Sequence, residues 1–323
     1  MDSQNAGHNF GEGGEARRRL IDKLQRELGP EVLQALKDPQ VVEVMLNPDG
    51  RLWQDRHGEA MREIGRMAPT RASNLIGTIA SMLGTTVGVD RPILECELPL
   101  DGSRFEGLLP PIVEGPAFNI RKKALLVYSL ADYVRQGVLN EQQRQVIAEQ
   151  IEARKNILVV GSTGSGKTTF CNALLAHIAE VDPDTRVAVI EDTRELQCPA
   201  VNTVPLRTSE TVDMTMLLRA CMRMRPDRIV VGEVRDKAVL ALLKAWNTGH
   251  PGGVATVHAN SAEAGLTRVE QLIQEGGILP IPAVIAEAIN CIVSIQRTSQ
   301  GRRIQEICLI KAGSEGGYEV TPV

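Results

Sequence analysis

Apolar positions follow two alternating patterns over the second half of the chain. Short apolar runs of strand length occupy residues 157–160, 187–190, 229–231 and 254–257. Between them, apolar residues recur every three or four positions, the spacing of helices that bury one face. This alternation predicts an α/β fold, with a mostly parallel sheet covered by helices on both faces. The helices are expected near residues 139–153, 167–178, 214–224 and 237–246, and one further strand at 304–310.

The first part of the chain mixes a few helices with strands joined by turns. Apolar residues fit a helix over 15–37, interrupted near Gly29-Pro30, and a second helix over 70–83 with Thr70 as its cap and Gly84 as its stop. This pattern predicts a smaller α+β domain. Its strands are expected at residues 41–46, 51–54, 93–98, 104–109 and 118–121. The predicted boundaries are a disordered tail over 1–14, the α+β domain over 15–128, a linker over 129–140 and the α/β domain over 141–323.

Composition narrows the class of protein. A chain of 323 residues with 43% hydrophobic and 24% charged residues is typical of a soluble globular protein of two domains. A formal charge of −4 argues against non-specific coating of DNA. The six cysteines include no C-x-x-C pair, and no apolar stretch reaches the roughly 18 residues of a membrane span. We therefore expect a cytoplasmic protein with reduced thiols and no transmembrane segment.

A glycine-rich loop follows the apolar run at 157–160. It matches the pattern G-x-x-x-x-G-K-[ST] and lies between a predicted strand and a predicted helix, as a P-loop does. Glycines let the backbone wrap an anion, and the amides and the helix N-terminus supply positive potential. Lys167 is expected to reach the β- and γ-phosphates of ATP, and the Thr168 hydroxyl to hold Mg²⁺. The predicted nucleotide-binding residues are Gly161, Ser162, Thr163, Gly164, Ser165, Gly166, Lys167, Thr168 and Thr169.

Carboxylates follow two of the predicted core strands. Glu191 and Asp192 come after the run at 187–190, and Glu233 follows the run at 229–231. In open α/β sheets, ligands bind at the carboxyl ends of the strands. Glu233 is therefore the first candidate for orienting the attacking water and Glu191 the second, and either could hold Mg²⁺ through water. The alternative for each is an acidic residue in the first turn of a helix.

Two further features modify this site. Gly232 stands where a Walker B strand usually carries aspartate, so Mg²⁺ would depend more on Thr168 and water. His258 follows the run at 254–257, where a histidine could contact the γ-phosphate, although a structural role is the common one for a lone histidine. His250 is expected to be structural.

These segments, in their order and spacing, resemble the secretion ATPase superfamily. The resemblance covers about residues 101–260 and includes that family's Walker A, Asp box, Walker B and His box motifs. They correspond here to residues 161–169, Ile190-Glu191-Asp192-Thr193-Arg194-Glu195-Leu196, Arg225-Pro226-Asp227-Arg228-Ile229-Val230-Val231-Gly232-Glu233, and 249–260.

The resemblance implies a RecA-like motor domain preceded by a PAS-like domain, and a ring of six copies at the inner membrane. It also implies that arginines stabilise the γ-phosphate, as planar guanidinium groups can. Arg104, Arg121 and Arg225 stand in the matching stretches; the roles of Arg219, Arg223 and Arg228 stay open. The implied activity is ATP hydrolysis that drives pilus assembly or substrate passage through a conjugation channel, whose membrane components would be the partners.

Two features indicate which branch of the family the chain resembles. The short N-terminal domain and the phrase Gly249-His250-Pro251-Gly252-Gly253 look most like conjugal-transfer ATPases of the TrbB type in type IV secretion. The alternatives are a type IV pilus or type II secretion motor, a nucleotide-gated assembly scaffold with little turnover, and a DNA-translocating ATPase. Sequence-specific contact with nucleic acid is not expected.

Overall fold

The computed structural model describes residues 9–56, 59–123, 127–209, 211–298, 301–314 and 317–323. The chain forms two compact units, residues 1–125 and 126–323, which are described separately. Of the helices in the described residues, none is both long and apolar enough to cross a membrane.

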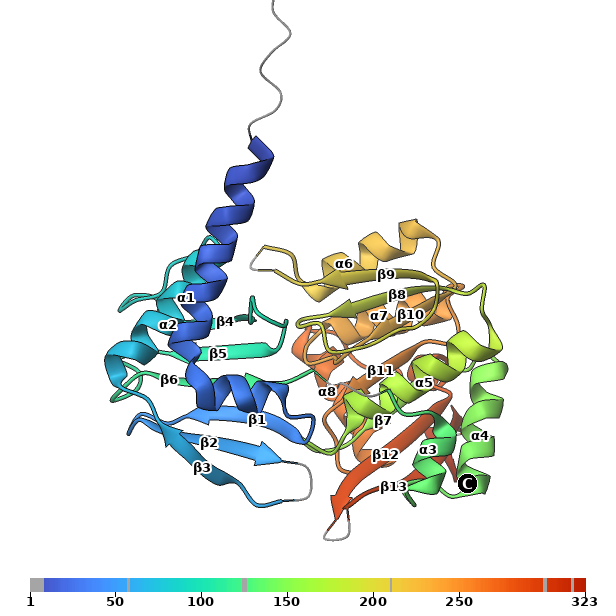
Figure 1. Ribbon diagram of the computed structural model, residues 1–323. Coiled ribbons are helices and arrows are strands. Elements are labelled where there is room, and N and C mark those ends of the chain that lie inside the picture. Colours follow the sequence, from blue (N-terminus) through green and yellow to red (C-terminus); the bar gives the residue numbers. More distant parts are fainter. Residues whose placement is uncertain (1–8, 57–58, 124–126, 210, 299–300, 315–316) are drawn as a thin grey trace, which may run out of the picture. The chain divides into compact units, whose positions relative to one another are not determined.

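The first unit pairs two helices with an antiparallel sheet of six strands among the described residues (Figure 1). The strand order is β3-β2-β1-β6-β5-β4, and buried side chains from both helices and from the sheet form one core. The predicted strands and helices are present, and β3 is additional. The elements are α1 (Asn9–Lys37), β1 (Val41–Leu46), β2 (Arg51–Arg56), β3 (Arg62–Arg66), α2 (Pro69–Met82), β4 (Ile93–Glu97), β5 (Arg104–Leu108) and β6 (Ala117–Arg121).

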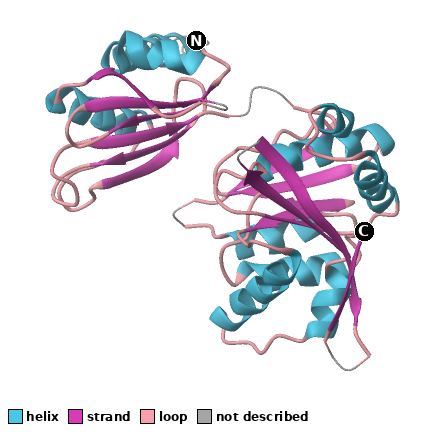
Figure 2. Cartoon of the chain, turned by 90° about the horizontal axis from the view of Figure 1, so that it is seen from below, coloured by secondary structure: helices cyan, strands magenta, loops and turns pink. Residues whose placement is uncertain are grey.

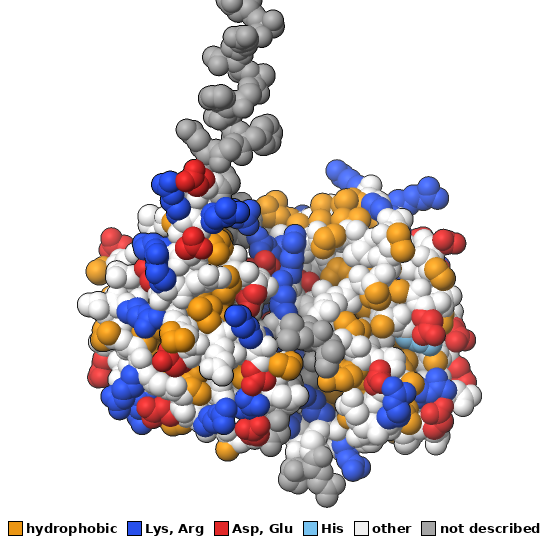
Figure 3. Space-filling model, viewed as in Figure 1, with side chains coloured by type: hydrophobic (Ala, Val, Ile, Leu, Met, Phe, Trp, Pro, Cys, Tyr) orange, Lys and Arg blue, Asp and Glu red, His pale blue; other side chains and the backbone are white. Residues whose placement is uncertain are grey.

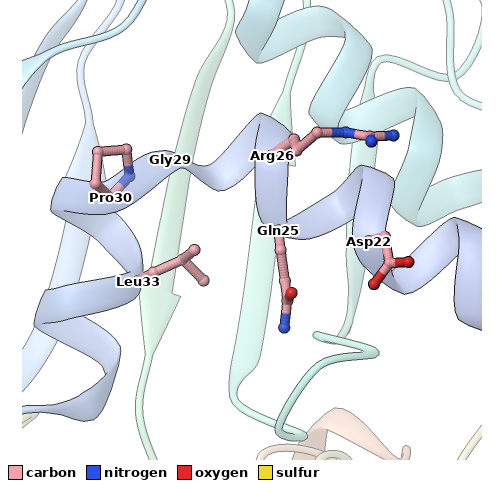
Figure 4. Close-up of a pocket in the computed structure, with 6 residues that line it drawn as sticks. All are labelled: Asp22, Gln25, Arg26, Gly29, Pro30 and Leu33. Carbon is pink, nitrogen blue, oxygen red and sulfur yellow. The ribbon is translucent and has the colours of Figure 1, made fainter.

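Helix α1 is two helical segments joined at Gly29. Gly29 has a φ of 81°, which a residue with a Cβ adopts only with strain, and Pro30 follows it. The Arg71 guanidinium of α2 donates to the carbonyls of Arg26 and Glu27, which the interruption leaves without helical partners. The predicted interruption is therefore confirmed. A pocket of about 500 Å³ lies beside the interruption. Figure 4 shows the residues that line it, which are Asp22, Gln25, Arg26, Gly29, Pro30 and Leu33.

Two sequence-based expectations about helix starts differ from the structure. Helix α1 begins at Asn9, inside the tail expected to be disordered, and residues 1–8 of that tail lie outside the described residues. The predicted Thr70 cap is wrong, since the N-cap of α2 is Ala68, with no side-chain cap, and Pro69 starts the helix. Proline lacks an amide hydrogen, so a helix that starts with it has one fewer donor to satisfy.

The second unit is built on a sheet of eight strands among the described residues, in the order β14-β13-β12-β7-β11-β10-β8-β9. The strands from β12 to β9 are parallel to their neighbours, and β12, β13 and β14 are antiparallel, so the predicted mostly parallel sheet is confirmed. Its strands are β7 (Ile157–Val160), β8 (Arg186–Glu191), β9 (Asn202–Arg207), β10 (Arg228–Val231), β11 (Val254–Val257), β12 (Cys291–Thr298), β13 (Gly301–Ala312) and β14 (Tyr318–Pro322).

Helices cover both faces of this sheet (Figure 2). Each face has its own cluster of buried apolar side chains. Residues 129–140, expected as a linker, contain the short helix α3, whose Leu130 and Tyr133 are buried in one of these clusters. Helices α3, α4 and α5 pack near one another (Figure 1). The helices are α3 (Leu130–Arg135), α4 (Glu141–Glu152), α5 (Lys167–Val181), α6 (Met214–Cys221), the 3₁₀ helix η1 (Met222–Met224), α7 (Ala238–Asn247), α8 (Ala262–Glu275) and α9 (Pro282–Ala288).

Candidate functional site

The glycine-rich loop leaves the buried strand β7 and enters α5 at Lys167, as predicted. Gly164 and Gly166 have φ angles of 71° and 102°, in the region that favours glycine. Gly161 is required for space, because a Cβ there would lie 2.3 Å from the Ile295 carbonyl oxygen. The loop therefore has the backbone conformation and close packing that its glycines permit.

The Lys167 ammonium lies within this loop. Its Nζ donates to the carbonyl oxygens of Gly161 at 2.8 Å and Ser162 at 3.0 Å. It also lies 3.2 Å from Nδ1 of His258. The residue is 8% exposed, so its charge is held beside the loop amides, where an anion would bind.

Three further side chains continue from Lys167 along the carboxyl edge of the sheet. His258 follows β11, and its Nε2 lies 2.7 Å from Oε1 of Glu233, which follows β10. Arg235 Nη2 donates to the other oxygen, Oε2, at 2.9 Å. Although Oε1 is close to His258, it is buried and has no aligned hydrogen-bond donor among the described residues. This oxygen can therefore accept a proton or orient a water molecule.

The electrostatics favour a carboxylate beside a neutral imidazole. Burial raises the pKa of Glu233, but the hydrogen bond and charge of Arg235, with His258 and Lys167, outweigh it, so the pKa lies below its ordinary value. Burial lowers the pKa of His258, Glu233 opposes this, and the charges of Lys167 and Arg235 lower it further. Neutral His258 can accept from Lys167 at Nδ1 while its Nε2 carries the proton.

We expect His258 to be protonated only below its ordinary pKa of 6.5. Its folded-state pKa is depressed, so the stability associated with neutral His258 is present above pH 6.5 and is lost as the pH falls through the folded value. An NMR titration of the His258 ring measures this pKa. Lys167→Ala should raise it by removing a neighbouring positive charge, and a wild-type pKa at or above 6.5 would contradict this assignment.

Glu191, at the end of β8, has a different environment from Glu233. Its Oε1 accepts hydrogen bonds from the backbone amides of Glu195 at 3.0 Å and Leu196 at 2.8 Å, and the residue is 6% exposed. A Cβ at Gly232 would lie 3.0 Å from Cγ of Glu191. The glycine in the Walker B position therefore makes room for the Glu191 side chain, which holds the turn after β8.

The donors available for Mg²⁺ include one that the sequence analysis did not single out. Thr168 Oγ1 donates to Oε2 of Glu195 at 3.4 Å. A hydroxyl and a carboxylate at the mouth of a phosphate-binding loop are hard oxygen donors of the kind Mg²⁺ prefers. The residues present therefore fit a magnesium ion, with Thr168 and Glu195 closest to its expected place.

Arg104 and Arg121 lie together in the first unit. They are directly opposite each other on the neighbouring strands β5 and β6, and Arg121 faces Glu43 of β1 on its other side. Nε of Arg121 lies 3.6 Å from a Glu43 oxygen. Arg104 is in turn directly opposite Glu97 of β4, so the two arginines lie between two carboxylates across the strands of this sheet.

Arg225 is not near Lys167 within the chain. It precedes β10 and caps η1 with a φ of 54°, whereas Glu233 follows the other end of the same strand. Because β7 and β10 run parallel in one sheet, Arg225 lies at the opposite edge from the loop. Arg219 and Arg223 are exposed, and Figure 3 shows basic side chains projecting around α6. Arg228 is buried and donates to the Gly252 carbonyl, so its role is structural.

The glycine-rich segment at 249–253 has a packing role. A Cβ at Gly252 would lie 2.4 Å from the Arg228 guanidinium, and one at Gly253 would lie 2.1 Å from the indole nitrogen of Trp246. His250 contacts the Ala245 carbonyl, in agreement with the structural role expected for it.

Arg235 and Glu195 were not predicted as site residues from the sequence. Arg235 is two residues from Glu233, and Glu195 lies within the Asp box stretch, so both were within segments already identified. Neither pattern predicts which atoms these side chains contact, because that depends on how the turns after β8 and β10 fold.

Comparisons with known proteins agree with this geometry. Residues 99–308 match the family described as Type II/IV secretion system protein. The probable conjugal transfer protein TrbB of Sinorhizobium fredii is 51% identical over 302 residues, covering 94% of this chain and 93% of that protein. The type IV secretion system protein PtlH of Bordetella pertussis is 32% identical over 307 residues, covering 83% and 89%.

A solved structure shows the same fold. The pilus retraction motor PilT with bound ADP matches with a TM-score of 0.64 at 19% identity, covering 91% of this chain and 83% of that one. At this identity the likeness concerns the fold alone. The match over residues 99–308, together with the 51% identity to a conjugal transfer protein, shows that this chain belongs to the Type II/IV secretion system protein family.

Proposed function

We propose that the protein is an ATP-hydrolysing motor of a type IV secretion or conjugative transfer system. The observation that carries this proposal is the contact of the P-loop lysine, Lys167, with His258 and through it with Glu233. Family membership and relatives named for conjugal transfer support the apparatus in which it works.

Each side chain has a part in hydrolysis. Lys167 exchanges the carbonyls of Gly161 and Ser162 for the β- and γ-phosphate oxygens of ATP. Oε1 of Glu233 orients the attacking water and receives its proton, while Arg235 holds the other oxygen and fixes the carboxylate. His258, released from Lys167, contacts the γ-phosphate. Glu191 holds the turn that carries Glu195 and is the second candidate for orienting water.

Thr168 and Glu195 would hold Mg²⁺, with Glu191 and Glu233 acting through water. The ion would neutralise charge that develops on the phosphate oxygens. Because glycine replaces aspartate at position 232, the ion would depend more on the hydroxyl of Thr168 than in a site with the usual Walker B aspartate.

Three arginines would reach the nucleotide from elsewhere than the carboxyl edge of the second unit's sheet. Arg104 and Arg121, side by side on β5 and β6, would stabilise charge on the γ-phosphate. Arg225 lies at the far edge of its own sheet, so it would act on the site of a neighbouring copy. This arrangement calls for a closed ring, and six copies is the number we propose.

The two units would then have distinct tasks. The second unit would be a RecA-like motor domain and the first a PAS-like domain that moves as nucleotide binds and leaves. The ring would act in the cytoplasm at the inner membrane, in contact with components of the secretion or conjugation channel. Pilus and type II secretion motors are the alternative settings, since the fold is shared with PilT.

The proposal is tested by steady-state phosphate release from ATP and Mg²⁺. Lys167→Ala should lower turnover by at least ~100-fold, because a positioned charge on the transferred group is lost. Lys155→Ala, which removes an exposed lysine just before β7, is the matched control and should leave turnover unchanged. Equal residual rates in the wild type and Lys167→Ala would instead identify a nucleotide-gated scaffold. Hydrolysis that requires DNA and falls steeply with salt would identify a DNA translocase.

A further inference from the structure

The side of the P-loop facing β12 and β13 carries a cation that the mechanism above does not use. Arg302, near the start of β13, packs its side chain across the last glycine of the loop. A Cβ at Gly166 would lie 2.8 Å from Cδ of Arg302 and 3.0 Å from its Nε. The stem of the arginine thus covers the residue just before Lys167.

The register of β13 explains why Arg302 points there. Residues two apart on a strand share a face, so Arg302 is on the side of Ile304, which is buried in the cluster that contains Phe170 of α5. Arg303 lies on the other side and is exposed. Arg302 therefore extends the α5 side of the sheet to the loop.

Arg302 lacks the partners expected for a partly buried cation. Its Nε is buried and has no hydrogen-bond acceptor, and the guanidinium forms no ion pair within the described part of the chain. Removing a charged group from water without a partner is unfavourable. An anion bound beside Gly166 would supply the missing acceptor.

Aromatic side chains lie in the same region. The Tyr133 ring of α3 packs edge-on against Phe170 with 5.3 Å between ring centroids, and Tyr128 packs edge-on against Tyr133 at 6.1 Å. Burial raises the pKa of Tyr133, and the charge of Arg302 acts on its hydroxyl in the opposite direction. Tyr128 is partly exposed and packs against Tyr133, so it offers an aromatic surface beside the ring on which Arg302 acts.

The order of strands fixes which end of a nucleotide would reach this group. Strand β7, which carries the loop, lies between β11 and β12. His258 and Glu233 come from the β11 and β10 side, where the γ-phosphate would be, and Arg302 comes from the β12 and β13 side. A triphosphate laid across the loop from the catalytic side would thus bring its α-phosphate and nucleoside toward Arg302.

We propose that Arg302 binds the nucleotide at its α-phosphate and that Tyr128 contacts the base. This inference rests on the proposed function, since it requires that the P-loop bind a nucleotide. Guanidinium groups bind phosphate oxygens through directed hydrogen bonds, and aromatic rings provide a sequence-tolerant surface for a base. The nucleoside end would then be held by Tyr128, just before α3, and by Arg302 of β13, which are more than 120 positions apart in the chain.

The test compares the affinities of ADP and of inorganic tripolyphosphate, measured by calorimetry on the full chain. Tripolyphosphate can fill the loop but has no nucleoside. Arg302→Ala should weaken ADP about tenfold, the loss expected for a charge-assisted hydrogen bond. Tyr128→Leu should weaken ADP and leave tripolyphosphate unaffected. Arg303→Ala removes the same charge from the opposite face and should change neither affinity.

Other results would overturn the inference. Unchanged ADP affinity in Arg302→Ala, with thermal unfolding like that of the wild type, would exclude contact with the nucleotide. Arg302→Ala should also weaken tripolyphosphate, because its third phosphate can occupy the place of the α-phosphate, and unchanged ADP affinity in Tyr128→Leu would exclude the contact between Tyr128 and the base. If Arg302→Ala unfolds, Arg302→Lys, which keeps the charge but loses the planar fork, should still weaken ADP. Wild-type protein that binds neither ligand would instead contradict the proposed function itself.

Discussion

Replacement of Glu233 by glutamine is expected to stop ATP turnover while ATP binding persists. Glutamine keeps the shape of the side chain but cannot take a proton from water. In the wild type the buried Oε1 has no aligned donor among the described residues, so it is available to accept that proton. The rate of phosphate release should fall by ~100-fold or more, as the loss of a general base typically costs. Affinity for ATP, measured with Mg²⁺ present, should change little, since Lys167 and the loop amides are intact.

Asp192→Asn is the matched control for this substitution. Asp192 is a carboxylate at the same edge of the sheet, where it accepts a hydrogen bond from Thr208 at 2.9 Å, and it has no contact with Lys167 or His258 among those described. It should retain most of the turnover. Undiminished phosphate release in Glu233→Gln, or an equal loss in both variants, would overturn the role given to Glu233.

Gly253→Ala is expected to destabilise the second unit severely. An added Cβ would lie 2.1 Å from Nε1 of Trp246 and 2.3 Å from the Ile229 carbonyl oxygen, and these two atoms are themselves hydrogen bonded at 3.1 Å. Ile229 is a buried residue of β10 and Trp246 is buried against it, so neither can move freely. Overpacking together with loss of a buried hydrogen bond should lower the free energy of unfolding by about 4 kcal/mol.

Gly249→Ala separates this steric effect from backbone strain. Gly249 has a φ of 106°, but a Cβ there would meet nothing within 4 Å. The substitution should therefore cost only the ~1–2 kcal/mol of an unfavourable dihedral. Urea unfolding followed by far-ultraviolet circular dichroism measures both variants. Equal stability of the two would show that the space beside Trp246 can be vacated, contrary to this prediction.

The elements carrying the motifs were predictable because their signals are local. The apolar run before the loop, the stripe of Phe170, Leu174 and Ile178, and the glycines themselves are contiguous in sequence, and the structure confirms the strand and helix they predict. Strand β11 is also found where its apolar run placed it.

Elements without such signals were missed. Strand β9 lies at the edge of the sheet, alternates half-buried and exposed positions and contains Pro205, which is unfavourable in a central strand. Strand β12 is apolar, but no element was predicted between residues 260 and 304, which also contain α8 and α9. No turn signal links β12 to β7, its parallel neighbour more than 130 residues earlier.

The sequence by itself determined that a glycine-rich loop of the P-loop pattern stands between a buried strand and a helix, and that Glu233 and His258 follow other strands of the same sheet. Local spacing suffices for this, because parallel strands bring their carboxyl ends to one edge. Only the tertiary structure decided that Glu191 fills the space left by Gly232, that Arg235 holds Glu233, and that Arg302 lies against Gly166. These contacts depend on strand order and on the path of each turn, where side chains distant in sequence meet by packing that no periodicity encodes.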